Sequence, residues 1–255
     1  MKALVLAAGY ATRLRPLTDS SAKPLLPVAG RPILDWILDA IGEVGDIDEV
    51  HVVTNARYAL AFGEWAAGTD IRIHDDGTHS NDDRLGAIGD LSFVLRETGI
   101  DDDLLVIAGD NLFEFDLGDF VGFWRGFERA SALAVHDVGS RELAKHYGIV
   151  ALDGASRVVD FVEKPSDPPS TLAATATYLF HRDHVALVAT YLAEGNSHDQ
   201  PGHFVNWLRS HEAVYGWVFT ESWFDIGSEE QLLEADNHMR ARHGLPQRDV
   251  YTPAA

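Results

Sequence analysis

LAAGYATRLRPLTDSSAKPLLPVAGRPI, residues 6–33, is the stretch of sequence that decides the fold. It begins at the end of an apolar run, residues 2–8, which is typical of a strand buried on both faces of a parallel sheet. The chain then turns at Gly9, crosses a long loop that carries Lys23, and enters a helix predicted over residues 32–44. Long loops without structure of their own are uncommon unless they are functional. The stretch therefore predicts the first βα unit of an α/β fold, with a functional loop inside it.

This loop has the features of a phosphate-binding segment. In doubly wound folds, ligands bind outside the carboxyl ends of the strands, where the loop begins. Gly9 lets backbone N–H groups approach a phosphate closely, and Arg13 and Lys23 supply positive charge. Two common alternatives are disfavoured. Ala11 and Leu14 occupy the later glycine positions of a GxGxxG pattern, and the GKS or GKT sequence of a P-loop does not occur.

Strand and helix patterns alternate through the first half of the chain. Strands are predicted over 49–55, 70–75, 103–110 and 131–138, and helices over 57–67, 86–97 and 116–128. This alternation is typical of a mostly parallel sheet with right-handed crossovers. The predicted fold class is therefore α/β, Rossmann-like and doubly wound.

After residue 138 the pattern changes. Short strands over 148–152, 157–164 and 175–181 are linked by turns, which predicts a small antiparallel subregion laid over the C-terminal edge of a mixed sheet. Further elements are helices over 182–194 and 202–210, a strand over 214–219, and a last helix after WFDIG at 223–227. Ser228 and Gln231 form a capping box for that helix. The tail from residue 245 contains two prolines and is predicted to wander.

The composition limits the classes of function. The formal net charge of −20 repels nucleic acid and anionic membranes, whereas a small anion can bind where the few cations converge. Only four lysines occur, at positions 2, 23, 145 and 164. The chain has no cysteine, which excludes disulfides and thiolate chemistry. No apolar stretch approaches the roughly 20 residues that span a bilayer and no secretory signal is recognised, so a cytoplasmic location is expected.

LAAGYATRLRPLT followed by KPLLPVAGRPI resembles the signature of the sugar-1-phosphate nucleotidyltransferase family. This family includes glucose-1-phosphate thymidylyltransferases and uridylyltransferases, mannose-1-phosphate guanylyltransferases and related cytidylyltransferases. Further matches follow in the family's order to about residue 240. The resemblance implies Mg²⁺-dependent transfer of NMP from an NTP to a sugar 1-phosphate, which gives an NDP-sugar and pyrophosphate.

The resemblance also assigns roles within one domain, residues 1–244, followed by a tail, residues 245–255. Residues 1–138 form the nucleotide-binding half and residues 139–227 the sugar-phosphate-binding half. In the opening stretch it implies that the nucleotide is bound by Leu6, Ala8 and Gly9. It also implies two catalytic cations, Arg13 and Lys23.

RLGAIGDL, residues 84–91, resembles the family's LGTAGAL segment, where a loop and the start of a helix meet the base. This similarity implies that Gly86 binds the nucleotide, although a glycine at a helix start is by itself ordinary. Ala87 replaces the usual threonine and Asp90 is acidic. The base is therefore left open, because no residue between His74 and Asp90 dictates it by spacing.

AGDN, residues 108–111, follows the most strand-like segment of the chain. The resemblance makes Asp110 a Mg²⁺ ligand and Asn111 a contact of the sugar, and a carboxylate at the end of a central strand faces the same crevice as the opening loop. By itself the sequence is more typical of a turn after a strand than of a metal site. WFDIGS, residues 223–228, resembles the family's W-x-D-x-G, which implies that Asp225 is the second Mg²⁺ ligand.

HYGIVALDGASRVVDFVEKP, residues 146–165, resembles the family elements that hold the sugar and its phosphate. Gly148 is implied to bind through its backbone, Glu163 through sugar hydroxyls, and Lys164 through the phosphate, which makes Lys164 catalytic as well. A carboxylate beside an ammonium suits a polyol phosphate, although such a pair before a proline is also common at surfaces. Tyr178 lies on the next sugar-facing strand and is a further candidate.

Several other residues are interpreted as structural. His181 and His184 have no third ligand in register, so we expect surface residues and no zinc site. Trp207 and Trp217 are expected in the core or in the wall of the sugar site. Residues 101–103, all aspartate, precede a strand instead of ending it and are interpreted as a solvated turn, not as the DxD motif of a glycosyltransferase.

The implied chemistry needs no general base, because a phosphate monoester with a second pKa of about 6 is largely a dianion at neutral pH. Three alternatives remain: a cytidylyltransferase for a non-sugar phosphate or phosphonate, a non-catalytic regulatory homologue that binds nucleotide sugar, and a glycosyltransferase. The sequence does not identify the nucleobase of the NTP or the phosphate that accepts the nucleotide. Enzymes of this family often form dimers or tetramers, so a homo-oligomer is compatible with the resemblance.

Overall fold

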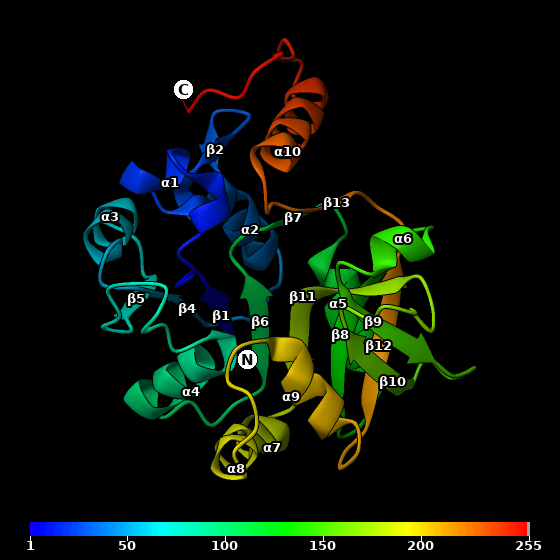
Figure 1. Ribbon diagram of the computed structural model, residues 1–255. Coiled ribbons are helices and arrows are strands. Elements are labelled where there is room, and N and C mark those ends of the chain that lie inside the picture. Colours follow the sequence, from blue (N-terminus) through cyan, green and yellow to red (C-terminus); the bar gives the residue numbers. More distant parts are fainter. Residues whose placement is uncertain (254–255) are drawn as a thin grey trace.

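The apolar run at the start of the chain lies inside a nine-stranded sheet in the computed structural model, which describes residues 1–253 (Figure 1). Strand β1 (Lys2–Leu6) pairs in parallel with β4 (Glu49–Thr54) on one side and with β6 (Leu104–Ala108) on the other. Strand β5 (Arg72–Asp75) continues the sheet in parallel beyond β4. These four strands confirm the parallel half of the predicted α/β fold.

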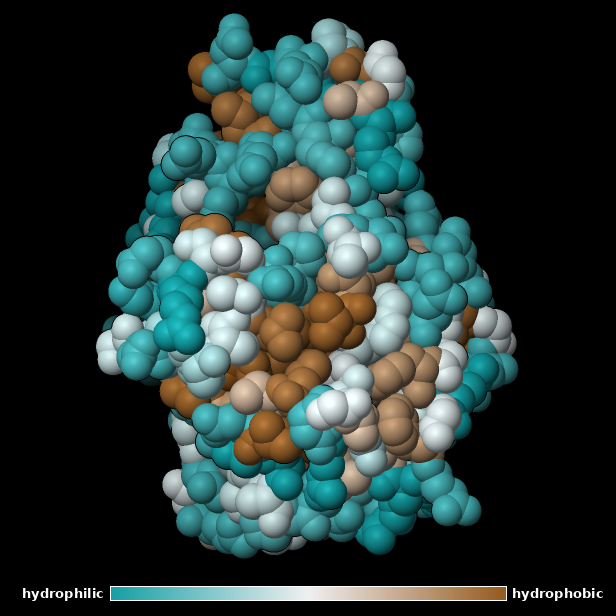
Figure 2. All heavy atoms as spheres, turned by 90° about the vertical axis from the view of Figure 1, so that its right-hand side faces the viewer, coloured by the Kyte–Doolittle hydropathy of each residue, from teal (hydrophilic) through white to brown (hydrophobic). Residues whose placement is uncertain are grey.

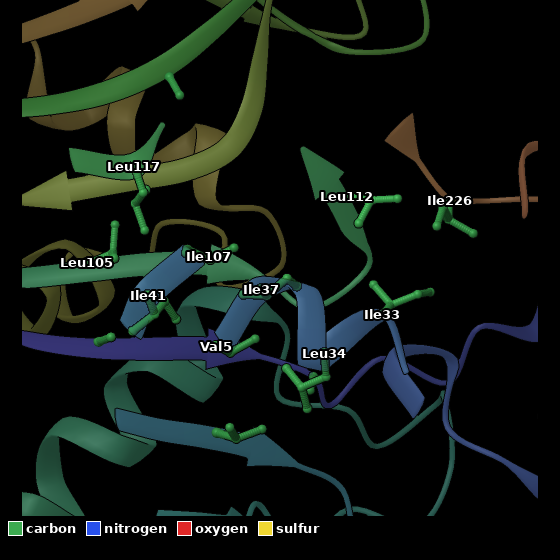
Figure 3. Packing of buried hydrophobic residues seen from close by; sticks show 14 of the residues in the cluster. Val5, Ile33, Leu34, Ile37, Ile41, Leu105, Ile107, Leu112, Leu117 and Ile226 are labelled. Carbon is green, nitrogen blue, oxygen red and sulfur yellow. The ribbon is translucent and has the colours of Figure 1, made fainter. Parts of the chain in front are cut away.

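Successive residues of β1 face two hydrophobic cores, one on each face of the sheet. Ala3 and Val5 belong to the first core and Leu4 to the second, and all three are fully buried. In the first core, helix α2 (Ile33–Gly42) turns its apolar stripe toward β1 and β6, as Figure 3 shows. Each such aliphatic side chain contributes about 1.5–3 kcal/mol when it is buried. Burial on both faces explains why the first strand has no polar alternation.

The second half of the chain extends the same sheet with antiparallel strands. Strand β11 (Leu172–Phe180) pairs antiparallel with β6 and with β8 (Ser131–Asp137), and β12 (Val214–Phe219) pairs in parallel with β8. The antiparallel hairpin of β9 (Gly148–Leu152) and β10 (Val158–Glu163) joins β11 at its other end. The antiparallel subregion is thus present, but it continues the central sheet instead of lying over its edge, because β11 bonds directly to β6.

The remaining elements frame this sheet. The opening loop contains short elements that its sequence pattern does not predict, namely η1 (Thr12–Leu14), α1 (Leu17–Ser20), η2 (Lys23–Leu25), β2 (Pro27–Val28) and β3 (Arg31–Pro32). Later helices are α3 (Ala59–Trp65), α4 (Ala87–Thr98), α5 (Leu117–Trp124), α6 (Arg141–Ala144), α9 (Pro201–Leu208) and α10 (Glu229–Arg242). The helix predicted over 182–194 forms as two, α7 (Arg182–Val185) and α8 (Leu187–Ala193). Two short strands pair outside the main sheet, β7 (Asn111–Phe113) and β13 (Trp223–Asp225).

Apolar side chains reach the surface on the right-hand side of Figure 1. Val159 and Val162 of β10 and Val218 of β12 are exposed, and Figure 2 shows an apolar area on this side of the molecule. Trp207 of α9 and Trp217 of β12 are partly buried against the two cores, as predicted. No helix within residues 1–253 is long and apolar enough to cross a membrane.

His184 is buried, although the sequence predicts that both His181 and His184 lie at the surface. Its Nδ1 lies 2.8 Å from Oγ of Ser131, and its Nε2 lies 3.5 Å from Glu212. His181 is partly exposed and caps α7 by accepting a hydrogen bond from the N–H of Asp183. The prediction is wrong for His184 because α7 packs that side chain against β8, a contact between segments distant in the sequence.

The tail after α10 is anchored, although its prolines predict that it wanders. Residues 245–253 contain no helix or strand, yet Tyr251 is buried in the first core and its hydroxyl donates to the carbonyl of Pro27 at 2.8 Å. The N–H of Arg248 donates to Oδ1 of Asn237 at 2.7 Å, on α10. The tail therefore fastens α10 to the β2–β3 hairpin.

We predict that Tyr251→Ala lowers the free energy of unfolding by about 3 kcal/mol, because it leaves a cavity in the first core and removes the donor to Pro27. Urea denaturation measures the change. Val250→Ala is the matched control, since Val250 is the exposed neighbour and its truncation is expected to cost less than about 0.5 kcal/mol. Equal urea midpoints for the two variants would show that the tail contributes nothing.

Candidate active site

Two cavities open where the strands of the sheet end, and they share a wall. The loop cavity, about 460 Å³, is lined by the opening loop and the start of α4. The strand cavity, about 490 Å³, is lined by β9, β10 and β11. Five residues line both, which are Arg13, Asn111, Ala176, Pro201 and Asp225. Every site residue predicted from the sequence lines at least one of these cavities, so the structure brings the whole predicted set together.

The residues from Gly9 to Thr12 offer backbone N–H groups at the loop cavity. Within residues 1–253 these four groups have no hydrogen-bond acceptor. The carbonyls beside them are held by the protein: Nδ2 of Asn55 donates to the oxygen of Ala8 at 2.8 Å, and Oγ1 of Thr18 donates to that of Ala11 at 3.0 Å. A run of free N–H groups backed by anchored carbonyls is an arrangement that binds anions.

Ala11 has the backbone of a glycine. Its φ of 44° and ψ of 44° are left-handed, which costs a residue with a Cβ roughly 1–2 kcal/mol. The same position is one where a GxGxxG pattern would place glycine. Strain of this kind is kept where the surrounding structure enforces it, often at functional sites. With alanine at position 11 the loop keeps the conformation that glycine would favour, but that conformation has a higher free energy.

Lys23 joins three segments in the loop cavity. Its Nζ donates to Oδ2 of Asp110 at 2.5 Å and to the carbonyl of Ile226 at 2.8 Å. Asp110 follows β6 and Ile226 follows β13, and the N–H of Ile226 donates to the carbonyl of Asp110 at 3.2 Å. Burial alone would raise the pKa of Asp110, but the ammonium of Lys23 outweighs it and lowers that pKa. Asp110 is thus an ionised carboxylate paired with a cation.

Asp225 places a second carboxyl group beside Asp110. It is the last residue of β13 and lies opposite Asn111 of β7. Burial and the charge of Asp110 raise the pKa of Asp225 to about 6. Within residues 1–253, no three or more His, Cys, Asp or Glu side chains are grouped as a ligand set for a metal ion. Two carboxylates at a cavity junction suit Mg²⁺, which keeps several ligands from water and substrate phosphates.

Asn111 fixes the orientation of Asp110. Its Nδ2 donates to Oδ1 of Asp110 at 2.9 Å, and its own Oδ1 accepts from Nε1 of Trp223 at 2.6 Å. The side chain is buried, so both bonds are shielded from water. Trp223 lines the strand cavity and holds Asn111 from that side.

Glu163 ends β10 and Lys164 follows it, and both line the strand cavity. A Cβ on Gly148 would lie 2.9 Å from Oε2 of Glu163 and 2.7 Å from the ring of Phe161, so only glycine fits there. Burial raises the pKa of Glu163, and Lys164 offsets part of that rise. Nζ of Lys164 is 3.8 Å from Oε1 of Glu163 and half exposed, and the residue has a left-handed φ of 45°. The pair presents a carboxyl group inside the cavity and a cation at its mouth.

A bulge in β11 forms part of the wall between the cavities. The register of β11 against β8 shifts between Ala174 and Tyr178, and Ala176 has a left-handed φ of 53°. Thr175, Ala176 and Tyr178 all line the strand cavity. Burial, and then the charge of Glu163, raise the pKa of the Tyr178 hydroxyl, which stays protonated at neutral pH. β11 has two extra residues relative to β8 at this shift, and Ala176 within it lines both cavities.

Gly86 begins α4 against another part of the chain. It has a φ of 77°, and a Cβ there would meet the carbonyl oxygen of His198 at 2.6 Å and Cα of Asp199 at 2.7 Å. The first N–H groups of α4 are occupied as well, because Ala87 donates to Asp199 and Ile88 to His198, each at 2.9 Å. Gly86 lines the loop cavity, and the close backbone approach that it permits is made by the protein itself.

Asp90, in the first turn of α4, is a buried acid beside the loop cavity. Burial, followed by the nearby charge of Asp76, raises its pKa to about 8. Asp90 attracts attention in the sequence as an acidic residue in an otherwise small and apolar motif. The sequence does not single out the neighbouring Asp76, because that residue lies in a polar loop rich in aspartate.

Sequence reasoning misses several other lining residues. On the loop cavity, Arg84 forms an ion pair with Asp199 at 3.3 Å and donates to the carbonyl of Asn81 at 2.7 Å. On the strand cavity, Lys145 and Gln200 are further polar residues. The Arg84–Asp199 pair joins positions 115 residues apart, so no local pattern predicts it.

Comparisons with known proteins agree with this architecture. The sequence profile of the family described as nucleotidyl transferase matches residues 2–242. The bifunctional protein GlmU of Methanocaldococcus jannaschii is 27% identical over 239 residues, which are 94% of this chain and 54% of GlmU. The chain thus spans about half the length of that curated relative.

Two solved structures share the fold. A Bacillus anthracis protein assigned as a glucose-1-phosphate thymidylyltransferase superposes with a TM-score of 0.78 at 21% identity, over 94% of this chain and 95% of that one. An apo UDP-glucose pyrophosphorylase also superposes with a TM-score of 0.78, at 19% identity, over 95% of this chain and 99% of that one.

The raised pKa of Asp90 makes a prediction about stability. An exposed aspartate titrates near pH 3.9, so between about pH 4 and pH 8 the folded state holds a proton that the unfolded state has released. Stability is therefore lost as pH rises through that window, by up to about 1.4 kcal/mol per pH unit. We predict that Asp90→Asn, measured by urea denaturation, becomes progressively more stable than the wild type from pH 5 to pH 7. Asp82→Asn, at an exposed position nearby, controls for the loss of a carboxylate, and a constant difference across this range would contradict the prediction.

Proposed function

Because the chain belongs to the nucleotidyl transferase family, we propose that it transfers the nucleoside monophosphate of an NTP to a sugar 1-phosphate and releases pyrophosphate. The family match agrees with the resemblance carried by the opening motif. The observation that carries the proposal is the shared wall between two phosphate-suited cavities. A reaction between two phosphorylated substrates requires such a junction, with positive charge and carboxylates gathered at it.

The loop cavity is the site for the triphosphate. Its free N–H groups at residues 9–12 bind phosphate oxygens without needing a side chain. Arg13 lies at the wall that both cavities share, and Lys23 lies in the loop cavity, so the two cations offset the charge that develops on the leaving pyrophosphate. The base then extends toward Gly86 at the start of α4.

The strand cavity is the site for the acceptor. The carboxyl group of Glu163 is largely buried beside Gly148, where it accepts hydrogen bonds from hydroxyl groups of a sugar. The ammonium of Lys164 is half exposed at the mouth of the cavity and attracts the acceptor phosphate. Tyr178, whose hydroxyl stays protonated, supplies a donor at the same wall.

The chemistry follows from this placement. An oxygen of the acceptor phosphate attacks the α-phosphorus of the NTP, a new phosphorus–oxygen bond forms, and the bond to the β-phosphate breaks as pyrophosphate leaves. No base is required, because the acceptor phosphate is already a dianion at neutral pH. The protein supplies position and charge, which are the main sources of catalysis in phosphoryl transfer.

Asp110 and Asp225 are the residues that would hold Mg²⁺. When bound there, the ion offsets negative charge on the phosphates between which the transfer occurs. The present contact of Lys23 with Asp110 keeps the carboxylate ionised and oriented toward the junction. Asp225, with a pKa of about 6, is largely ionised at pH 7 and ready to coordinate a cation.

The first experiment is a panel of NTPs against sugar 1-phosphates in the presence of Mg²⁺, with the released products identified. Release of pyrophosphate together with an NDP-sugar supports the proposal. Release of a nucleoside diphosphate from a nucleotide sugar would indicate a glycosyltransferase, and binding of nucleotide sugar without turnover would indicate a regulatory homologue.

We predict that Asp225→Asn, and equally Asp110→Asn, keeps the fold but lowers Mg²⁺-dependent pyrophosphate release at least about 10²-fold, because one ligand charge is lost at the junction. EDTA should have the same effect on the wild type. Asp167→Asn is the control, since Asp167 is an exposed carboxylate outside both cavities. Near-normal turnover by both junction variants would refute the metal assignment.

We predict that Lys164→Ala raises the KM for the sugar phosphate by about tenfold or more and leaves the affinity for NTP unchanged. The reason is that Lys164 lines only the strand cavity. Steady-state kinetics with each substrate varied in turn measures both effects. Lys2→Ala, which removes a cation paired with Asp48 and Glu49, is the control. An equal rise in both KM values would place Lys164 outside the acceptor site.

A further inference from the structure

The proposed reaction does not use two acids at the loop cavity: Asp90, which is buried and lines the cavity, and Asp76, which is partly buried and lies beside Asp90. Asp90 is only 6% exposed, although it lines the cavity beside Gly86 and Ala87. Its Oδ1 is buried without a hydrogen-bond partner, and so is Oδ2 of Asp76. Unpartnered oxygens in a protein interior are costly, so a pair of them at one place requires a physical explanation.

The other oxygen of Asp76 is fully engaged. Oδ1 of Asp76 accepts from both the N–H and the hydroxyl of Thr78, each at 2.7 Å. The hydroxyl of Thr78 in turn lies 3.0 Å from that of Tyr10, in the opening loop. Asp76 is therefore fixed in position and cannot turn its free oxygen toward water.

A single proton on Asp90 gives both unpartnered oxygens a hydrogen-bond partner. The two carboxyl groups are close enough to share a hydrogen bond when Asp90 is protonated, and burial and Asp76 together raise the pKa of Asp90 to about 8. Asp90 then donates to Asp76, and its remaining lone pairs are acceptors. At neutral pH Asp90 thus offers an acceptor oxygen to the cavity, because its proton is already donated to Asp76.

We propose that Asp90, supported by Asp76, reads the nucleobase of the NTP and selects a base with an exocyclic amino group over one with a carbonyl at the same edge. The inference rests on the proposed function, because it assigns the loop cavity to the NTP. An amino group donates to the free acceptor of Asp90, as in cytosine, guanine or adenine. The carbonyl of uracil or thymine would instead face an acceptor, which leaves two desolvated oxygens opposed.

The surrounding loop keeps this acid pair in a fixed place. Asp83 accepts from the N–H and the hydroxyl of Ser80, each at 2.7 Å, and Arg84 is tied to Asp199 across the cavity. Asn81, between these anchors, also lines the cavity. A carboxyl group that distinguishes bases by their hydrogen-bonding groups must be held rigidly, because a mobile one would accommodate either base.

The test uses pairs of nucleotides that differ at one exocyclic group, with the full chain and Mg²⁺ and without acceptor. Isothermal titration compares CTP with UTP and ATP with ITP, which exchange an amino group for a carbonyl, and GTP with ITP, in which hydrogen replaces the 2-amino group. We expect the amino member of at least one pair to bind about 10-fold to 100-fold more tightly. Equal affinities within all three pairs, or tighter binding of the members that lack the amino group, would overturn the inference.

Two variants separate base reading from a structural role. Asp90→Ala should weaken binding of the preferred amino nucleotide about tenfold or more and leave the carbonyl member unchanged, so that the preference disappears. Asp90→Asn should keep the preference, because its NH₂ donates to Asp76 and its oxygen remains an acceptor. A uniform loss with every nucleotide in Asp90→Ala, or loss of the preference in Asp90→Asn, would refute base reading. If Asp90→Ala does not fold, the wild-type pairs and Asp90→Asn decide.

The same measurements distinguish this inference from the proposed function. If the amino nucleotide binds selectively but no sugar phosphate releases pyrophosphate, the proposed reaction fails and base reading stands. If pyrophosphate is released but uridine or thymidine triphosphate is the better ligand, the reaction stands and the role of Asp90 fails.

Discussion

The site depends on one partly buried contact, the hydrogen-bonded ion pair between Lys23 and Asp110. These residues are 87 positions apart, and the same ammonium also binds the carbonyl of Ile226, so three distant segments meet at one nitrogen. Burying charges is costly unless both partners are satisfied, so such a pair is weak support for stability and strong support for a defined geometry. Here the geometry brings the ends of β6 and β13 together, and with them Asp110 and Asp225.

Within residues 1–253, five non-glycine residues have left-handed backbones, and three of the five line the two cavities. Ala11, Lys164 and Ala176 all have left-handed backbones without being glycine, and all three line a cavity. Each such residue costs on the order of 1–3 kcal/mol, which the packed sheet beneath it must offset. The left-handed backbone of Ala11 lies within the run of free N–H groups, that of Lys164 carries the ammonium group of the strand cavity, and that of Ala176 lies in the bulge of β11. Three of the five strained positions therefore lie on the cavities assigned to the two substrates of the proposed reaction.

The parts of the fold that follow from local pattern are predictable, and those that depend on distant contacts are not. Continuous apolar runs identify β1 and β6, and the position of Asp110 after β6 places it at the carboxyl end of the sheet. Nothing local indicates that β11 pairs with β6, that Tyr251 returns to the first core, or that His184 is buried. The same limit applies to the site: Asp90 is conspicuous in its motif, whereas the contact with Asp76 exists only because α4 packs beside that loop.

The placement of the few lysines reconciles the acidic net charge of the chain with the anion chemistry proposed for the site. A net charge of −20 repels polyanions, yet three of the four lysines, Lys23, Lys145 and Lys164, line the two cavities. Exposed charges are screened beyond roughly 8 Å at physiological ionic strength, so the acidic surface acts weakly on a ligand inside a cavity, where the nearest cations dominate. The small phosphates of the proposed reaction would meet these cations inside the cavities, whereas a polyanion would meet the acidic exterior. An acidic protein can therefore bind two anions next to each other, because its few cations are placed where they meet.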